Sequence, residues 1–162
     1  MTDTNPRLTH VASDGTARMV DIGAKPETER MARATGNIVM SAKTLEAIVG
    51  NAVAKGDVLG VARVAGIMAA KRTADLIPLC HPLALTDVAV RFRPDSTLPG
   101  VRAEAVVRTR GRTGVEMEAL VAVTIALLTV YDMAKGMDKS MIVNEIALAD
   151  KTGGAGGPYT RA

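Results

Sequence analysis

The sequence predicts an α+β domain, and three observations lead to that prediction. Two stretches alternate apolar and polar residues, as half-buried strands do, and two others are apolar over helical lengths. The segments follow one another as strand, helix, strand, strand, helix, strand. The chain has 162 residues, 48% of them hydrophobic, which suits one compact domain. This order matches the ferredoxin-like split βαβ arrangement, an antiparallel four-stranded sheet with helices packed on one face.

The first strand is expected at Arg30–Met40, although Gly36 interrupts it. Glycine weakens a strand because it has no side chain to pack. Ser41 follows this segment directly, and serine is a preferred N-cap residue. A short helix is therefore expected from Ser41 to about Val49.

The second helix is expected to begin at Asp57, whose carboxylate can cap its N-terminus. From Val58 to Ala70 only Arg63 carries a charge. A helix that is apolar on most of its circumference must be covered by other parts of the protein. Lys71 and the polar residues after it mark the solvated end.

Two strands and a hairpin follow this helix. Thr86–Arg93 alternates apolar with charged residues, and Val101–Arg110 repeats the pattern. Pro94–Gly100 between them has the composition of a hairpin loop. The pattern predicts two antiparallel neighbours, each with one face toward the core.

A long helix is expected from about Gly114 to Lys135, and Met141–Ala149 is expected to form the last strand. The helix is apolar nearly all round, which a two-layer domain cannot cover alone. An oligomer is therefore expected.

Composition excludes several function classes. The net charge is +3 without any run of basic residues, and the chain has only three aromatic residues, so neither nucleic acid nor base stacking is indicated. The longest uncharged stretch, Ala119–Tyr131, is too short to suggest a bilayer span.

With a polar start and a single cysteine, the chain is expected to be cytoplasmic. A single domain over 1–162 is expected, with flexible ends at about 1–17 and 153–162.

Two carboxylates begin and end one stripe of the long helix. At about 100° per residue, Glu118 and Asp132 fall on the same side, and Lys135 follows three residues beyond Asp132. One interpretation is an ordinary surface ion pair. The other is an acid/base pair, in which a partly desolvated Lys135 has its pKa lowered toward neutrality.

The start of the same helix carries Glu116. Thr113 and Glu116 fit the S/T-x-x-E capping box, in which each side chain accepts a backbone N–H of the other residue. This role in helix capping and a role in a binding pocket are both open for Glu116. No such box accounts for Glu118.

A loop with Leu79, Cys80 and His81 lies between two prolines. Proline fixes the backbone, so the direction of the His81 ring is set, and this side chain is expected to hydrogen-bond a ligand. Zinc ligation is disfavoured because adjacent Cys80 and His81 lack the usual ligand spacing, and the only other histidine is His10. Cys80 is interpreted as buried scaffold.

Two lysines lie beside glycines. Lys55 precedes Gly56 and Asp57 at the expected start of a helix, and Lys151 precedes the glycine-rich end. A helix N-terminus with a neighbouring lysine can bind a phosphate. No Walker motif is present, and each lysine alone is more often a solvated surface residue.

Six motifs in this order and spacing resemble the MoaC family of molybdenum-cofactor biosynthesis: Met19–Ile22, Lys55–Leu59, Ala65–Lys71, Leu76–Leu83, Thr113–Leu120 and Thr129–Lys135. The resemblance extends from about Leu8 to Gly157. It implies a ferredoxin-like homohexamer, a trimer of dimers, with active sites between subunits. It further implies conversion of 3′,8-cyclo-7,8-dihydroguanosine triphosphate, supplied by a radical SAM GTP cyclase, into cyclic pyranopterin monophosphate and pyrophosphate.

The resemblance also assigns site residues. It implies that Asp132, Lys135, Lys55 and Lys151 are catalytic, and that the substrate is bound by Leu79, Cys80, His81, Glu116, Met117, Glu118 and Arg30. It requires no cofactor, although Mg²⁺ can accompany the triphosphate. The chain departs from the family at Ala155 and Gly156, where a lysine and a serine are usual. A non-catalytic ferredoxin-like module that binds a nucleotide or another small anion is the alternative.

Overall fold

The computed structural model describes residues 15–162 of the chain. Residues 1–14 lie outside the described residues. They include His10 and most of the segment 1–17 that was expected to be flexible. In chain order the elements are β1 (Thr28–Val39), α1 (Ala42–Val49), α2 (Val58–Ala70), α3 (Thr73–Leu76), β2 (Leu85–Asp95), β3 (Gly100–Gly111), α4 (Glu116–Ala134), β4 (Ile142–Thr152) and β5 (Tyr159–Thr160). All the elements expected from the sequence are present, and α3 and β5 are additional.

The strands form one antiparallel sheet in the order β2-β3-β1-β4-β5. Strand β3 lies between β1 and β2, which is the split βαβ order, so the predicted fold class is confirmed. The predicted number of four strands was wrong, because Tyr159 and Thr160 pair with Lys151 and Asp150 and add a fifth. Residues 153–158 form no regular structure, as expected, and flexibility of this end stays a prediction.

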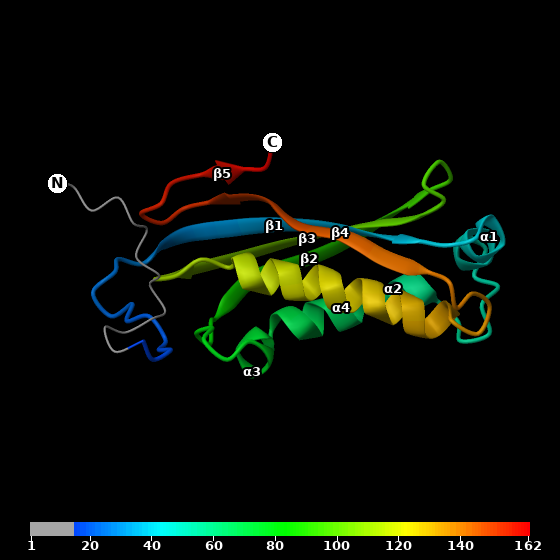
Figure 1. Cartoon of the computed structure of the whole chain (residues 1–162). Coiled ribbons are helices and arrows are strands. Elements are labelled where there is room, and N and C mark those ends of the chain that lie inside the picture. Colours follow the sequence, from blue (N-terminus) through cyan, green and yellow to red (C-terminus); the bar gives the residue numbers. More distant parts are fainter. Residues whose placement is uncertain (1–14) are drawn as a thin grey trace.

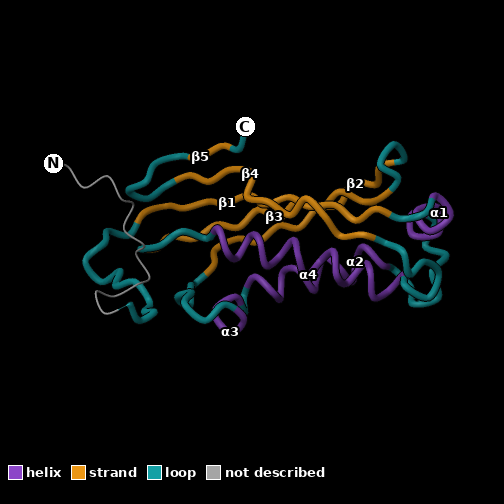
Figure 2. The backbone as a smooth tube through the Cα atoms, viewed as in Figure 1, coloured by secondary structure: helices purple, strands orange, loops and turns teal. Residues whose placement is uncertain are grey.

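Helices α2 and α4 lie side by side on one face of the sheet (Figures 1 and 2). Alanines and aliphatic residues of β1 and β3 meet α4 here, and Leu127 of α4 is fully buried. Gly66 of α2 lets the two helices approach closely, since a Cβ there would lie 2.9 Å from the Ala122 carbonyl oxygen. A core with few aromatic residues is thus built from close contact between backbones, as the composition indicated.

The other face of the sheet carries charged side chains. Arg91, Glu104, Arg33 and Asp150 form a row of ion pairs across β2, β3, β1 and β4, with separations of 3.3 Å, 3.2 Å and 2.6 Å. Hydrogen bonds to Asp150 and Glu104 raise the pKa of Arg33 further above its ordinary value. The sheet is therefore apolar toward the helices and ionic on its opposite face.

The helix starts agree with the sequence for two helices and not for the third. Ser41 Oγ accepts from the Thr44 N–H at 3.2 Å, and Asp57 Oδ1 accepts from the Gly60 N–H at 2.8 Å. The capping box predicted for α4 was wrong: Val115 is the N-cap residue and provides no side-chain hydrogen bond. The helix begins at Glu116, so Thr113 lies too far before it to act as the N-cap residue. Glu116 is therefore available for other contacts.

Helix α4 is the only described helix with the length and apolarity of a membrane span. More than half of it is buried within the fold, as is usual for the central helix of a globular domain. By contrast, α2 exposes Val61, Val64 and Met68 on its outer side, each close to half exposed. The expectation that another molecule covers part of the helical layer stays a prediction.

Candidate active site

A pocket of about 290 Å³ lies at the N-terminal end of α4. The His81 loop forms one wall, the start of α4 another, and residues 20–25 a third. Of the residues predicted to bind substrate, it brings together six in the lining: Leu79, Cys80, His81, Glu116, Met117 and Glu118. Val20, Ile22 and Lys25 also line it, and no sequence signal singled out Lys25.

Glu118 is the most unusual ionisable group of this pocket. It is only 4% exposed, and burial raises its pKa to about 7, with the nearby Glu116 charge adding to the rise. A carboxyl group with such a pKa can either donate or accept a hydrogen bond at neutral pH. It is therefore suited to orient a ring with both donors and acceptors.

Cys80 lies on the same pocket and is half-buried. Burial raises the pKa of its thiol, and the Glu118 charge raises it further. The thiolate is consequently disfavoured, which argues against a nucleophile. The interpretation of Cys80 as buried was wrong, because its side chain is partly exposed in the pocket lining.

Two further cations, Lys151 and Arg30, are not among the residues that line this pocket. Lys151 Nζ lies 3.5 Å from Glu116 Oε1, and the Gly156 backbone passes close to the same ammonium group. Arg30 Nε donates to the Gly111 carbonyl at 2.8 Å, and its guanidinium fills the space that a side chain at Gly154 would need. The glycine-rich end of the chain therefore turns around two cationic groups.

The second cluster lies at the other end of α4 and contains Asp132. Lys135 Nζ donates to Asp132 Oδ1 at 2.6 Å, and Lys55 Nζ donates to Asp132 Oδ2 at 3.0 Å and to its carbonyl oxygen at 2.9 Å. All three side chains are about half exposed. For Lys55 the sequence left open a phosphate contact at the start of α2 or a solvated surface position, whereas here it contacts Asp132 of α4.

Electrostatics corrects one expectation about this cluster. The hydrogen bond from Lys135, and then that from Lys55, lowers the pKa of Asp132. The hydrogen bond to Asp132 raises the pKa of Lys135, where the sequence suggested a lowered one. The prediction was wrong because Lys135 is exposed to solvent and paired with an anion, so desolvation is a minor influence.

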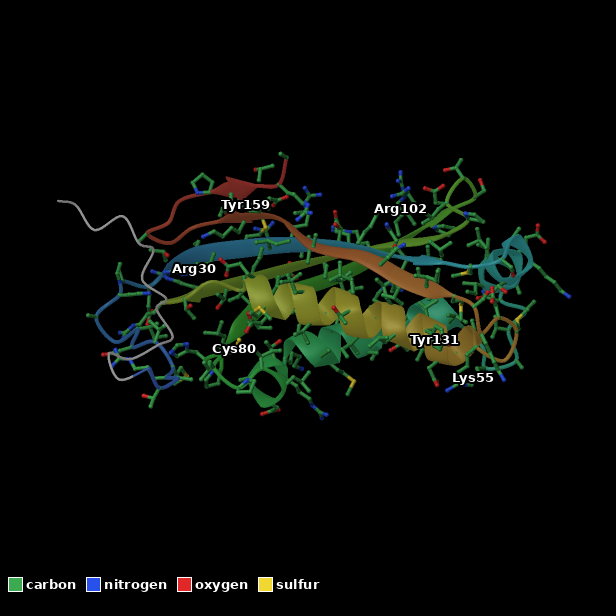
Figure 3. All side chains as sticks on the ribbon, viewed as in Figure 1. Arg30, Lys55, Cys80, Arg102, Tyr131 and Tyr159 are labelled. Carbon is green, nitrogen blue, oxygen red and sulfur yellow. The ribbon has the colours of Figure 1, made fainter. Side chains whose placement is uncertain are left out.

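The structure thus divides the predicted site residues between two places. Figure 3 shows Cys80 toward one end of the helical layer and Lys55 at the other. Glu118 and Asp132 are separated by 14 residues of one helix, which corresponds to about 21 Å. Within one chain the two clusters therefore do not form a single site.

Comparison with known proteins shows that the part of the sequence containing both clusters matches one family. Residues 19–154 match the MoaC family model, and this span includes both clusters. Relatives named cyclic pyranopterin monophosphate synthase from Brucella ovis and Brucella abortus are each 56% identical over 153 residues, which is 94% of this chain and 93% of theirs. A relative of the same name from Brucella suis is 55% identical over the same shares. Since the match extends over both ends of α4 and nearly the whole fold, the chain belongs to the MoaC family.

Proposed function

We propose that the chain is a cyclic pyranopterin monophosphate synthase, a lyase that converts 3′,8-cyclo-7,8-dihydroguanosine triphosphate into cyclic pyranopterin monophosphate and pyrophosphate. The observation that carries this proposal is the family match, together with identity above half to relatives of that name. The upstream radical SAM GTP cyclase would supply the substrate in the cytoplasm.

The pocket beside α4 suits recognition of the ring system and the phosphates. His81 and Glu118 line one cavity and would orient the guanine-derived ring. Lys151, which contacts Glu116 of this pocket, and Arg30, which lies beside the glycine-rich end, would hold the triphosphate. Charge that develops on departing pyrophosphate needs cations already in place. Mg²⁺ can accompany the phosphates, and no other cofactor is needed for this chemistry.

The Asp132 cluster suits proton transfer. Its pKa directions keep Asp132 as a carboxylate and Lys135 as an ammonium group at neutral pH. Asp132 would accept a proton from the substrate and Lys135 would deliver one, while Lys55 holds the carboxylate in position. The protonated state of Lys135 makes it the acid of the pair.

The two clusters can serve one reaction if two copies of the chain join. We infer that an antiparallel pair places the Asp132 cluster of one copy beside the Glu118 pocket of the other. The exposed stripe Val61, Val64 and Met68 on α2 supports such a contact, because a monomer gains nothing from leaving it in water. Three such pairs would give the homohexamer that the resemblance implies.

The alternative is a module that binds a nucleotide without turning it over. It accounts for the pocket but gives no reason for two lysines converging on Asp132. The test compares the parent with Asp132→Asn, and with Asp87→Asn, an exposed carboxylate on β2, as the matched control. Purified protein is incubated with the cyclic nucleotide, and pyrophosphate and pterin product are measured.

We expect turnover by the parent and by Asp87→Asn, and a loss of about 100-fold or more in Asp132→Asn, as for other general acid/base groups. Saturable binding without product, or full activity of Asp132→Asn, would refute the proposed enzymatic function. Light scattering should give about six times the 16.9 kDa mass of one chain. An active monomer would exclude a site shared between copies.

A further inference from the structure

Strand β4 contains two more residues than the part of β1 with which it pairs. The eleven residues Ile142–Thr152 lie along nine residues of β1, from Met31 to Val39. Asn144 pairs with Asn37 and Ala147 pairs with Thr35, so Glu145 and Ile146 together face one residue of β1. A second shift of this kind lies further along, where Ala149 is the extra residue. Each is a β-bulge.

Glu145 forms the first bulge. Its φ is 52°, in the left-handed region that residues with a side chain rarely adopt. Its carboxylate accepts a hydrogen bond from the Nδ2 group of Asn37, which is only 5% exposed. Opposite the bulge, a Cβ on Gly36 would lie 2.9 Å from Leu127 Cδ1 and 3.1 Å from Ile146 Cγ1. The glycine that interrupts β1 in the sequence is therefore the residue that makes room for this bulge.

The bulges determine which face of the sheet Lys151 occupies. Side chains alternate between the two faces of a strand, and each extra residue reverses the alternation for everything beyond it. With two bulges, Lys151 pairs with Ala32, whose side chain is buried under the helices, and reaches Glu116. With one bulge fewer and the same number of residues, Lys151 would pair with Met31 and point to the ionic face.

We propose that Glu145 is a positioning residue, whose bulge keeps Lys151 on the face where the phosphates are bound. The inference rests on the proposed function, because that function gives Lys151 its role. Glu145 acts through the position of Lys151 and does not contact the substrate. The positive φ at Glu145 then lets Lys151, beyond the bulge, point to the face of the sheet that carries the helices.

Three variants separate this role from a merely structural one. Glu145→Pro keeps the number of residues but cannot adopt a positive φ, because the proline ring fixes φ near −65°. Deletion of Glu145 also removes the bulge, yet it removes the extra residue with it, so Lys151 still pairs with Ala32. Glu145→Gly keeps the bulge without the carboxylate.

Two measurements are made on each folded variant. One is KM and kcat for pyrophosphate release from the cyclic nucleotide. The other is the rate at which an amine-acylating reagent modifies Lys151, followed by mass spectrometry, since the Lys151 side chain is only 25% exposed in the parent. The second readout does not depend on the reaction, so a parent without turnover would refute the proposed function and leave the position of Lys151 measurable.

We expect the deletion and Glu145→Gly to keep KM within about twofold, with Lys151 shielded as in the parent. Glu145→Pro should raise KM by about tenfold or more, as loss of a charge-assisted contact does, and should speed the acylation of Lys151. Parental KM and acylation in folded Glu145→Pro would overturn the proposal. If Glu145→Pro does not fold, the deletion decides: a shielded Lys151 supports the proposal, and an exposed Lys151 or an unfolded chain overturns it.

Discussion

Replacing Glu118 by Gln tests whether burial controls the protonation of the pocket. The side chain is 4% exposed, and burial raises its pKa from 4.5 to about 7. Since the folded protein holds the proton more tightly than the unfolded chain, the stabilisation from protonated Glu118 is full below about pH 4.5 and is lost as the pH rises through about 7. At about 1.4 kcal/mol per pH unit between the two pKa values, the loss amounts to about 3 kcal/mol.

Glutamine has nearly the same shape and no proton to release in this range. The quantity compared is the free energy of unfolding of Glu118→Gln minus that of the parent. We expect this difference to be larger at about pH 8.5 than at about pH 4.5, by up to about 3 kcal/mol. Urea unfolding at several pH values and one protein concentration measures this difference. Glu46→Gln, an exposed change on α1, is the matched control. A difference that does not change with pH would refute the reasoning.

Two further predictions concern the packing of the helical layer. Leu127→Ala should lower the free energy of unfolding by about 2–5 kcal/mol because Leu127 is fully buried. Leu128→Ala, at a residue 48% exposed, should lower it by about 1 kcal/mol or less. Similar losses at both sites in urea unfolding would contradict the packing. Gly66→Val should cost about 1–3 kcal/mol because the new side chain meets the Ala122 backbone, whereas Gly136→Ala, with open space around it, should change thermal stability little.

The parts of the fold that local chemistry determines could be predicted from the sequence. Ser41 and Asp57 cap their helices through neighbours three residues away, and the alternation in β2 and β3 follows from which face is buried. The capping box at Thr113 failed because the same local pattern is compatible with a helix that begins at Glu116, two residues after the expected start at Gly114. Strand β5 could not be predicted, since a two-residue strand exists only because β4 offers an edge to pair with.

The candidate site shows the same division. Motifs singled out the residues that line the pocket and form the second cluster, and Asp132 with Lys135 could be paired from their spacing on a helix. The contact between Lys55 and Asp132 joins residues 77 positions apart and depends on how α2 and α4 pack. The raised pKa of Glu118 depends on burial, and Lys25 enters the pocket through a loop without any periodic pattern. These properties arise from tertiary structure and leave no local signal.

The central position of β1 has a consequence for how the protein is made. Residues 28–39 leave the ribosome early, but their partners in the sheet begin only at Gly100 and Ile142. Until both have been synthesised, the backbone groups on the two edges of β1 have no sheet partner, and such unpaired strands favour association between nascent chains. Pairing over such long sequence separations is also slow. The sheet therefore forms only after β4 has been translated, and the yield of folded protein depends on what shields β1 during that time.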